Sequence, residues 1–501
     1  MQEKREITDI EDLNDAPLTS EAEKKKARKE KKRKRNRESL VISYVFFALF
    51  VALCINICKY VAVDSEEVSD NSFNARMAAL EEDMVRGNIV ADDGTVLAGT
   101  NVASDGSTER VYPYGSLFAH VVGYTGHGKS GLESLYNTKL LASHVSMIER
   151  ETNELNHIKN TGDTVCTTLN IDLQEAASNG LGLSKGAVVC MDPDTGAILA
   201  MVSKPDYNPN DIDADYATLS ADTDESALLN RVTQGLYPPG STFKMFDLIE
   251  YLREGKNPSS YSYNCTGTFT YGDSKIKCYH GEKHGQVGFV KSFAKSCNGS
   301  FANMGTTFDT EQFANDLDKL LFNTELPIDF DSAVSTYDLP KTASADQITQ
   351  TAIGQGGTLI TPFHECLMAC AIANEGKLMK PYLVSGIKAI NGTRVSQTSP
   401  STYKQLLSKD EAETVKECMA EVVNSGTGTK LKDNPWFTAY GKTGSAEFKE
   451  GSSVSHSWFV GFAEDENGKK MALAIIFEAK GSGSEYAVPL AKSLFATYFA
   501  D

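Results

Sequence analysis

Apolar residues form one long run near the N-terminus and recur in short periodic segments along the rest of the chain. The run covers residues 40–63 and reads LVISYVFFALFVALCINICKYVAV, which exceeds the about 20 residues that cross a bilayer. The segment just before it, Lys24 to Arg37, is almost entirely basic, so the positive-inside rule places the N-terminus in the cytoplasm. A cleaved signal peptide fits less well because its apolar region is shorter. We therefore expect an uncleaved transmembrane helix at residues 39–63, followed by an extracytoplasmic chain.

The first 38 residues differ in composition from the rest. They hold 13 of the 49 Lys and Arg residues and 10 of the 67 Asp and Glu residues. Such a segment buries too little apolar surface to fold, so we predict that residues 1–38 are a disordered cytoplasmic tail that contacts anionic lipid. The other residues carry 36 basic and 57 acidic side chains, a net charge of −21, which argues against nucleic acid as a partner.

The periodicity after the apolar run predicts several strands and one last helix. Residues 86–98 and 186–203 have apolar positions on both sides of a turn, which is typical of β-hairpins. Further strands are predicted at residues 457–464 and 470–479, and a helix near residues 488–498. Because mainly helical sequence separates these strands, we expect one sheet assembled from distant segments.

Two folded domains are expected in a chain of this length. The polar turn Asn160 to Asp163 precedes a strand-like segment and marks a boundary. The predicted domains are a smaller extracytoplasmic one at residues 64–160 and a larger one at residues 161–501.

A serine and a lysine lie three residues apart in YPPGSTFKMF, residues 237–246. If a helix begins after the Pro-Pro-Gly turn, Ser241 and Lys244 share one face of its first turn. A serine hydroxyl is a weak nucleophile unless a base takes its proton, and Lys244 can be that base if burial or positive charge lowers its pKa. The free N–H groups at the helix start can stabilise an oxyanion.

Two further short motifs strengthen the interpretation of Ser241 and Lys244 as catalytic residues. Ser296 and Asn298, in KSCNGSF, place a hydroxyl and an amide where they can relay a proton and bind a substrate amide. Lys442, Thr443 and Gly444, in AYGKTGSAEF, offer a cation and a hydroxyl for a carboxylate and a glycine that lets a substrate backbone approach. Each motif alone is a weak signal. Their order, with spacings of about 55 and about 145 residues, makes the combination specific.

The ordered trio resembles that of penicillin-binding proteins and class A β-lactamases. The chain is more similar to class B penicillin-binding proteins, the monofunctional peptidoglycan D,D-transpeptidases, because residues 86–98 and 128–137 also resemble their non-catalytic pedestal. The resemblance implies an α+β fold in which helices cover both faces of an antiparallel sheet, as in serine β-lactamases. A smaller N-terminal pedestal domain and one transmembrane helix complete the implied architecture.

The resemblance also implies a reaction. Ser241 would be the acylated nucleophile and Lys244 its base, while Ser296 and Asn298 would transfer protons and position the substrate. Ser241 would attack the D-Ala-D-Ala amide of a peptidoglycan stem peptide, and an amine of a second stem peptide would resolve the acyl-enzyme into a cross-link. β-Lactams would mimic the dipeptide and acylate the same serine.

The third motif and its surroundings would bind the substrate. The resemblance implies that Lys442 and Thr443 hold the terminal carboxylate and that the backbone N–H groups of Ser241 and Ser445 form the oxyanion hole. We expect no cofactor in the catalysis. The about 100 residues between the predicted span and the catalytic domain leave no room for a glycosyltransferase domain, so we expect a separate membrane-embedded glycan polymerase as partner.

Four other functions are conceivable for a chain with these motifs. A D,D-carboxypeptidase would use this site with water as the acceptor and stays open. A β-lactamase needs a carboxylate that positions a deacylating water, and no convincing one lies between the second and third motifs. A β-lactam sensor needs a cytoplasmic effector, which 38 residues do not provide. A scaffolding role in the wall machinery is compatible with catalysis.

One group of cysteines is spaced in a way that suits a metal. Cys265, Cys278, His284 and Cys297 follow the pattern C-x12-C-x5-H-x12-C, and three thiolates with an imidazole suit tetrahedral zinc. Some elongation-type class B relatives carry zinc between these two motifs, so the resemblance favours a structural zinc. A Cys265–Cys278 disulfide and free thiols stay open as alternatives. His280 is an alternative ligand.

One glycine-containing segment lies outside these motifs. Residues 424–431, NSGTGTKL, contain Gly-x-Gly but lack the other glycines and the preceding strand of a phosphate-binding loop. We predict instead a loop that borders the Lys-Thr-Gly strand.

Overall fold

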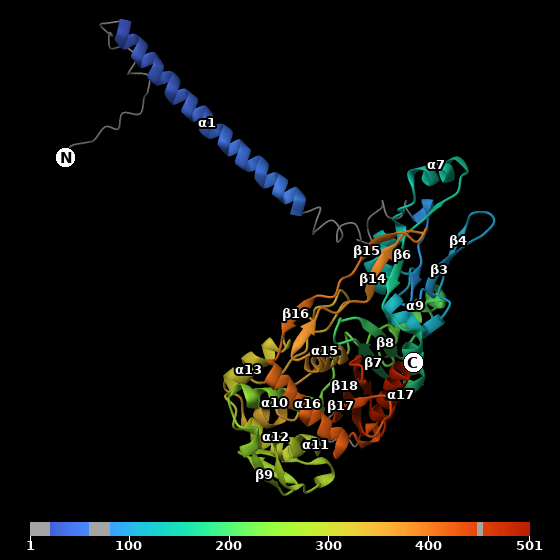
Figure 1. Ribbon diagram of the computed structural model, residues 1–501, viewed down its shortest axis with the longest axis vertical. Helices are drawn as coiled ribbons and strands as arrows, with labels where there is room; N and C mark the ends of the chain where they lie inside the picture. The colour runs from blue at the N-terminus through green and yellow to red at the C-terminus, as the bar shows by residue number, and fades with distance from the viewer. Residues whose placement is uncertain (1–20, 60–80, 448–453, 501) are drawn as a thin grey trace. The chain divides into compact units, whose positions relative to one another are not determined.

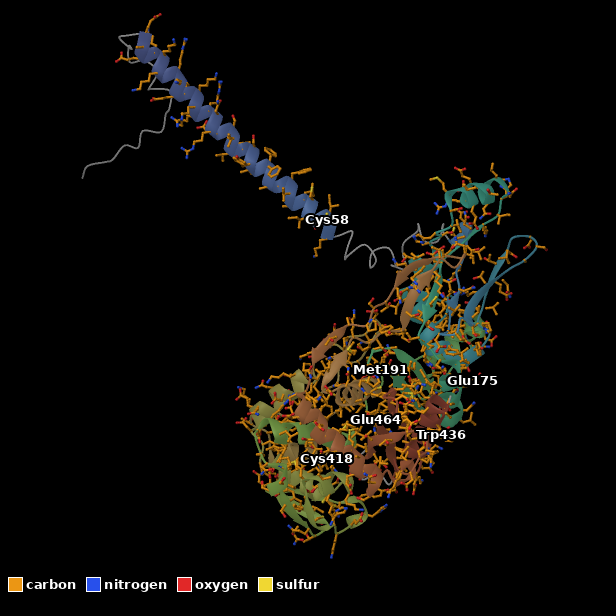
Figure 2. The ribbon with its side chains drawn as sticks, viewed as in Figure 1. Cys58, Glu175, Met191, Cys418, Trp436 and Glu464 are labelled. Carbon is orange, nitrogen blue, oxygen red and sulfur yellow. The ribbon has the colours of Figure 1, made fainter. Side chains whose placement is uncertain are left out.

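The computed structural model describes residues 21–59, 81–447 and 454–500, which belong to two compact units, Met1–Asn71 and Ser72–Asp501. The described part of the first unit is one helix, α1 (Glu21–Lys59), none of whose residues is buried. It is long and apolar enough to cross a membrane, and Figure 2 shows Cys58 near its C-terminal end. The other end of the predicted span, residues 60–63, lies outside the described residues.

Helix α1 begins earlier than predicted. Residues 21–38 were expected to be disordered, but they are helical and continue into the apolar segment. Lys, Arg, Glu and Ala are strong helix formers, and a helix that already exists extends at little cost because its nucleus is formed. Residues 1–20 of the expected tail lie outside the described residues.

The second unit contains a pedestal sheet with the order β15-β14-β6-β2-β3-β4 (Figure 1). The predicted hairpin at residues 86–98 is confirmed, since β2 and β3 pair antiparallel. The strands are β2 (Ile89–Val90), β3 (Val96–Val102), β4 (Thr108–Val111), β6 (Thr164–Thr167), β14 (Val384–Lys388) and β15 (Arg394–Gln397).

This sheet extends past the boundary predicted near residue 160. Strands β6, β14 and β15 all come from sequence assigned to the larger domain. Strand β6 pairs parallel with β2 and antiparallel with β14, so it satisfies backbone groups that would otherwise form an open edge. Sequence separation hides this pairing, because β14 lies more than 200 residues after β6.

Short helices and a two-stranded pair complete the pedestal. A buried carboxylate, Glu133, binds Arg86 at 2.6 Å and Arg110 at 2.7 Å. It thereby joins the two segments on which the family resemblance rests. The remaining elements are β1 (Met84–Val85), η3 (Gly115–Phe118), α4 (Ala119–Val122), α5 (Gly131–Leu135), α6 (Asn137–Leu141), α7 (Met147–Leu155) and β5 (Asn160–Thr161).

The catalytic region is built on an antiparallel sheet with the order β17-β18-β19-β7-β8. The hairpin predicted at residues 186–203 and the predicted strands near the C-terminus are confirmed. These strands are β7 (Gly186–Met191), β8 (Ile198–Lys204), β17 (Thr438–Glu447), β18 (Ser455–Glu464) and β19 (Lys470–Phe477).

Helices cover both faces of this sheet. Helices α8 (Ile171–Leu181) and α17 (Ala487–Phe499) pack on one face, and α15 (Pro362–Ala373) contacts β7, β18 and β19. Neighbouring strand residues such as Val188 and Val189 enter two different hydrophobic clusters, because successive side chains of a strand point to opposite faces. The expected architecture of helices around an antiparallel sheet is therefore confirmed.

The long segment between β8 and β17 carries most of the helices and, besides β14 and β15 of the pedestal sheet, six short strands. Its elements are η4 (Pro209–Asp211), α9 (Ile212–Ala221), η5 (Gly240–Thr242), α10 (Lys244–Arg253), η6 (Pro258–Ser260), β9 (Ser262–Cys265), β10 (Thr268–Tyr271), β11 (Ser274–Lys277), η7 (Tyr279–Gly281), β12 (Gly285–Gly288), α11 (Phe289–Ala294), α12 (Asn298–Gly305), α13 (Thr310–Lys319), α14 (Ala345–Thr351), β13 (Lys377–Met379), β16 (Thr402–Gln405), α16 (Lys409–Asn424) and η8 (Thr429–Leu431). Helix α10 follows the Pro-Pro-Gly turn as predicted.

Candidate active site

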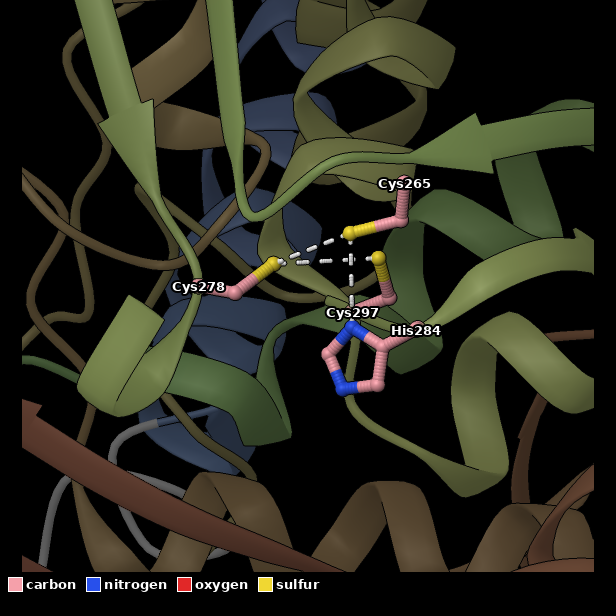
Figure 3. A group of neighbouring side chains, drawn as sticks. All are labelled: Cys265, Cys278, His284 and Cys297. Atoms are coloured by element: carbon pink, nitrogen blue, oxygen red, sulfur yellow. Dashed lines mark hydrogen bonds between the residues drawn. The ribbon is translucent and has the colours of Figure 1, made fainter. Parts of the chain in front are cut away.

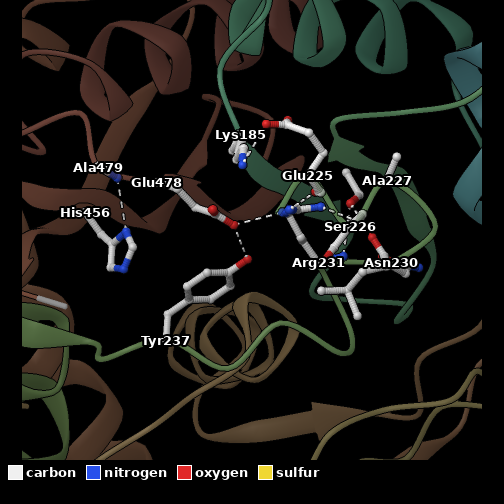
Figure 4. A network of polar contacts seen from close by, with 12 residues as sticks. Lys185, Glu225, Ser226, Ala227, Asn230, Arg231, Tyr237, His456, Glu478 and Ala479 are labelled. Carbon is white, nitrogen blue, oxygen red and sulfur yellow. Dashed lines mark hydrogen bonds and ion pairs between the residues drawn. The ribbon is translucent and has the colours of Figure 1, made fainter. Parts of the chain in front are cut away.

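The turn before the Ser-x-x-Lys motif is fixed by one side chain from β18 and one from the residue that follows β19. Tyr237 donates a 2.7 Å hydrogen bond from Oη to Glu478 Oε1, and Arg231 Nε donates to the same oxygen at 2.8 Å (Figure 4). Trp458 Nε1 donates to the Pro238 carbonyl oxygen at 3.1 Å. The sheet therefore determines where the turn ends.

Gly240 brings the turn close against β17. Its φ is +56°, in the left-handed region that favours glycine. A Cβ at this position would lie 2.9 Å from the Cβ of Ala446. The Gly240 N–H donates to the Gly354 carbonyl oxygen at 2.8 Å. A larger residue would push the start of the helix away from the Lys-Thr-Gly strand.

A buried carboxyl behind the turn was not identified from the sequence. Thr242 Oγ1 is hydrogen-bonded both to Glu365 Oε1 and to the Pro239 carbonyl oxygen. Burial raises the pKa of Glu365 to about 8, so this carboxyl is mainly protonated at pH 7. Because a hydroxyl has a single proton, both bonds are satisfied when protonated Glu365 donates to Thr242, which then donates to Pro239.

The first two motifs meet at the amine of Lys244. Its Nζ donates to Ser241 Oγ at 3.1 Å, to Asn298 Oδ1 at 2.7 Å and to Ser296 Oγ at 3.3 Å. It also donates to the Ser296 carbonyl oxygen at 2.9 Å. The structure therefore brings these four predicted residues together around one nitrogen.

Burial gives this amine the properties of a base. Lys244 is fully buried, and burial lowers its pKa to about 8. Lys442 is also fully buried, and burial together with the charge of Lys244 holds its pKa well below the usual value for lysine. The aromatic rings of Phe301 and Phe293 lie 5.2 Å and 5.5 Å from the two ammonium groups, and such contacts favour the charged forms.

Ser296 occupies a backbone position where glycine is usual. Its N–H donates to the Phe293 carbonyl oxygen and the next N–H, of Cys297, donates to that of Ser292. This pair of bonds is the Schellman motif that ends α11, with Ser296 at the left-handed position and a φ of +53°. A non-glycine residue there costs about 1 kcal/mol or more. In this backbone conformation the Ser296 hydroxyl contacts both lysine amines.

The Ser296 hydroxyl lies between the two amines. Lys442 Nζ donates to Ser296 Oγ at 2.9 Å, opposite the 3.3 Å bond from Lys244. Asn298 is oriented in turn, because its Nδ2 donates to the Lys277 carbonyl oxygen at 2.9 Å. A hydroxyl that accepts two hydrogen bonds from amines keeps its own proton free to donate to a leaving group.

The third motif lies on β17, at the edge of the sheet that faces η5. Lys442 Nζ donates to the Thr443 carbonyl oxygen at 2.8 Å. A Cβ on Gly444 would lie 3.0 Å from the Pro239 carbonyl oxygen, so this glycine lets the turn of the first motif lie close to β17. Ser445 follows on the same edge, and its role in the oxyanion hole stays a prediction.

The predicted metal ligands also meet, beside the second motif. The ligand atoms of Cys265, Cys278, His284 and Cys297 all lie within 4.8 Å of one another, and Figure 3 shows them pointing to a common centre. Cys278 Sγ lies 3.6 Å from Cys265 Sγ and 3.8 Å from Cys297 Sγ, and Cys265 Sγ lies 3.4 Å from His284 Nδ1. His280 is exposed and lies outside the cluster.

These distances fit a tetrahedral ion and not a disulfide. Zinc–sulfur bonds of about 2.3 Å place two sulfurs of a tetrahedron about 3.8 Å apart, and a sulfur and a nitrogen about 3.5 Å apart. A disulfide needs about 2.0 Å between its sulfurs, and the described cysteines are all free thiols. The chemistry and the spacing of the donors thus match a zinc site.

Comparison with known proteins agrees with this geometry. The sequence profile described as the penicillin binding protein transpeptidase domain matches residues 186–496, and that of the penicillin binding protein A dimerisation domain matches residues 86–165. The peptidoglycan D,D-transpeptidase PbpA of Mycolicibacterium smegmatis is 29% identical over 486 residues, which cover 91% of this chain and 97% of that protein.

Solved structures show the same relationship. The D,D-transpeptidase domain of a peptidoglycan glycosyltransferase from Eggerthella lenta has a TM-score of 0.75 and 31% identity, over 83% of this chain and 99% of that one. Penicillin-binding protein A of M. tuberculosis, solved as a penicillin G acyl-enzyme complex, has a TM-score of 0.74 and 26% identity over the same shares of the two chains. The chain therefore belongs to the penicillin-binding protein transpeptidase family.

Proposed function

We propose that this protein is a peptidoglycan D,D-transpeptidase that forms an acyl-serine intermediate on the D-Ala-D-Ala end of a stem peptide and is acylated by β-lactams. One observation carries the proposal. The buried amine of Lys244 contacts Ser241 Oγ, Ser296 Oγ and Asn298 Oδ1 at once, so nucleophile, base and proton relay are already assembled. The names of the relatives and the acyl-enzyme structures among the neighbours support it.

Acylation follows from these contacts. Neutral Lys244 removes the proton of Ser241 while Oγ attacks the carbonyl carbon between the two D-alanines. The helix start and the edge of β17 offer N–H groups to the tetrahedral oxyanion. Ser296 gives its proton to the departing nitrogen and regains one from Lys244, which returns to its neutral form, so D-alanine leaves as a neutral amine and the acyl ester remains on Ser241.

Deacylation uses the same groups in reverse. An amine of a second stem peptide enters the space that D-alanine left and attacks the acyl carbon. Its proton passes to Lys244, and Ser241 leaves as a hydroxyl once it is reprotonated. The product is a new amide bond between two stem peptides. Water in place of the amine would give a carboxypeptidase.

The proposal is tested by mapping the acylated residue. We expect the full-length protein in detergent to form a stable adduct with labelled penicillin, found by peptide mass spectrometry on Ser241, and Ser241→Ala to form none. Ser445→Ala changes a neighbouring hydroxyl on β17 but keeps the backbone N–H that is predicted to serve the oxyanion hole, so this variant should keep the adduct. Labelling of another residue, or no labelling of the wild-type protein, would contradict the proposal.

We further propose that the N-terminus is cytoplasmic and the catalytic unit extracytoplasmic. The support is the basic segment of α1, which precedes its apolar segment. An impermeant maleimide should label Asn391→Cys in whole cells and should reach Gln2→Cys only after the membrane is opened. The reverse pattern would refute the orientation.

A separate membrane-embedded polymerase is proposed to supply the glycan strands. The support is that residues 81–447 and 454–500 form a pedestal sheet and one acyl-transfer domain. The purified chain should cross-link preformed glycan and should not polymerise a lipid-linked disaccharide. Polymer formed by the purified chain alone would refute this proposal.

We propose that Cys265, Cys278, His284 and Cys297 hold a structural zinc ion, supported by the donor set and by the distances within the cluster. Bound zinc would fix the segments that carry these ligands, among them the loop of the second motif. Metal analysis should find about one zinc per chain in the wild-type protein and none in His284→Ala. His280→Ala should keep the metal. A metal-free wild-type protein with a Cys265–Cys278 disulfide would overturn the proposal.

A further inference from the structure

The loop at residues 424–431 contributes a hydroxyl to the carboxylate-binding strand. Thr427 Oγ1 lies 2.5 Å from Thr443 Oγ1. Thr427 is partly exposed, whereas Thr443 is 6% exposed. The loop was predicted to border the strand, and the structure shows that it also enters the third motif through this one side chain.

The loop is built to hold Thr427 in place. Its preceding residue, Gly426, packs so closely on the end of α11 that a Cβ there would lie 2.3 Å from the Ala294 carbonyl oxygen. Lys295 Nζ donates to the Ser425 carbonyl oxygen at 2.7 Å. The N–H groups of Gly426 and Gly428 both donate to the Val422 carbonyl oxygen at the end of α16, at 3.1 Å and 2.9 Å.

The same helix end that holds this loop also begins the turn at Ser296. Ala294 is the last residue of α11, and Ser296 follows it in the Schellman motif. Thr427 is therefore positioned by the backbone that places the second motif, and it contacts the third. A displacement at either motif would change the distance between the two threonine hydroxyls.

The direction of the hydrogen bond between the two hydroxyls matters for an anionic ligand. Each hydroxyl has one proton. If Thr443 donated to Thr427, a carboxylate at Thr443 would meet oxygen lone pairs. If Thr427 donates to Thr443, the proton of Thr443 is free for the carboxylate, and the bond it forms is of the stronger, charge-assisted kind.

We propose that Thr427 is a positioning residue for the terminal carboxylate of the substrate, because its hydroxyl donates to Thr443 Oγ1 and directs the Thr443 proton to the carboxylate. The assignment rests on the proposed transpeptidase function and extends it to a residue outside the three motifs. Thr427 acts through Thr443 and takes no part in the acylation of Ser241.

A comparison of two donor peptides distinguishes a role of Thr427 in carboxylate binding from a role in the stability of the loop. One ends in D-Ala-D-Ala with a free carboxylate, and the other is identical but ends in a carboxamide. We expect Thr427→Val to lower kcat/KM for release of the last residue about tenfold with the carboxylate peptide and less than twofold with the carboxamide. Thr427→Ser, which keeps the hydroxyl, should restore the wild-type value. Thr429→Val, at an exposed position of the same loop, should change neither value.

Full-length wild-type protein and the variants are compared in detergent, and thermal unfolding checks their folding. Thr427→Ala, which adds no volume, is measured in parallel in case the valine disturbs the loop. Equal losses with both peptides, or no loss with either, would overturn the positioning role while labelled penicillin still modifies Ser241. A wild-type protein that neither releases D-alanine nor reacts with penicillin would overturn the transpeptidase function itself.

Discussion

Two buried clusters share the loop at residues 296–298, and they are completed in different ways. Ser296 and Asn298 join the catalytic cluster, where each lysine amine already has oxygen partners. Cys297, between them, joins the Cys–His cluster, whose four side chains contact one another through thiol sulfurs and an imidazole nitrogen. The first cluster is preorganised by the protein alone, whereas the second is a set of donors that a metal would complete.

Contacts with both clusters hold the strained loop in one conformation. The left-handed backbone at Ser296 costs energy, and three kinds of contact hold it. They are the Schellman bonds to α11, the lysine bonds to Ser296 and the packing of Cys297 in its cluster. Substitutions that disrupt one cluster at a time distinguish residues that act in acylation from residues that hold the loop in place.

Removing the shared amine should cost the most. Lys244→Met takes away the base and leaves its buried volume filled, so we expect the rate constant of acylation by penicillin to fall about a thousandfold. Thermal unfolding should change little, because a buried amine is replaced by a side chain of similar shape. Lys377→Met, at an exposed position, is the matched control. A loss below tenfold would mean that another group acts as the base.

Breaking the Cys–His cluster should affect stability first and rate second. Cys265→Ser leaves both lysines untouched, so we expect the melting temperature to fall by roughly 5 °C, the effect of about 3 kcal/mol in a domain that spans residues 186–496. The acylation rate constant should fall by roughly tenfold as Cys297 loses its anchor. Cys418→Ser, at a buried cysteine outside the cluster, measures the cost of a buried hydroxyl alone. Equal effects of the two variants would contradict a supporting role for the cluster.

The pH profile of acylation should report the buried amine. Only neutral Lys244 can accept the serine proton, and burial lowers its pKa to about 8. The rate constant should therefore rise about tenfold between pH 7 and pH 9 and then level off. Glu365 titrates in the same range, since burial raises its pKa to about 8, so Glu365→Gln is measured as well. A midpoint that moves with Glu365→Gln would assign the profile to the carboxyl.

The smallest effect is expected at the turn that carries the first motif. Tyr237→Phe removes the hydrogen bond to Glu478 and keeps the ring contacts with Trp458. We expect a loss of about 1 kcal/mol of stability, seen as a fall of about 1–2 °C in melting temperature, with the acylation rate within threefold. Tyr403→Phe, at an exposed tyrosine, should change neither quantity. A large rate loss would show that the turn positions Ser241 more strongly than we infer.

The sequence predicts most of this fold where the signal is local. The hairpin at residues 186–203 and the C-terminal strands follow from short runs of apolar residues next to turn residues. The three motifs can be recognised in the sequence because their residue types, their order and the spacing between them are specific in combination. Strands β14 and β15 were not placed in the pedestal sheet, because their pairing with β6 depends on backbone contacts between segments far apart in the chain.

The same limit applies to the site. Thr427 contacts Thr443, and Glu365 contacts Thr242, only after the chain has folded. Neither residue belongs to a motif with a fixed spacing, so one sequence alone gives no sign of their contacts. The Cys–His cluster lies between these cases. Its residue types predict a metal site or a disulfide, and its distances favour the metal site, which stays a proposal.

The central claim, that Ser241 and Lys244 transfer an acyl group to an amine, is tested most directly by product analysis. Full-length protein in detergent is given a labelled stem peptide ending in D-Ala-D-Ala together with an amine-bearing stem peptide, and the products are separated by mass. We predict release of D-alanine and a cross-linked dimer in the wild-type protein, and neither in Ser241→Ala. Release of D-alanine with only the shortened, hydrolysed peptide would contradict transpeptidation and identify a carboxypeptidase.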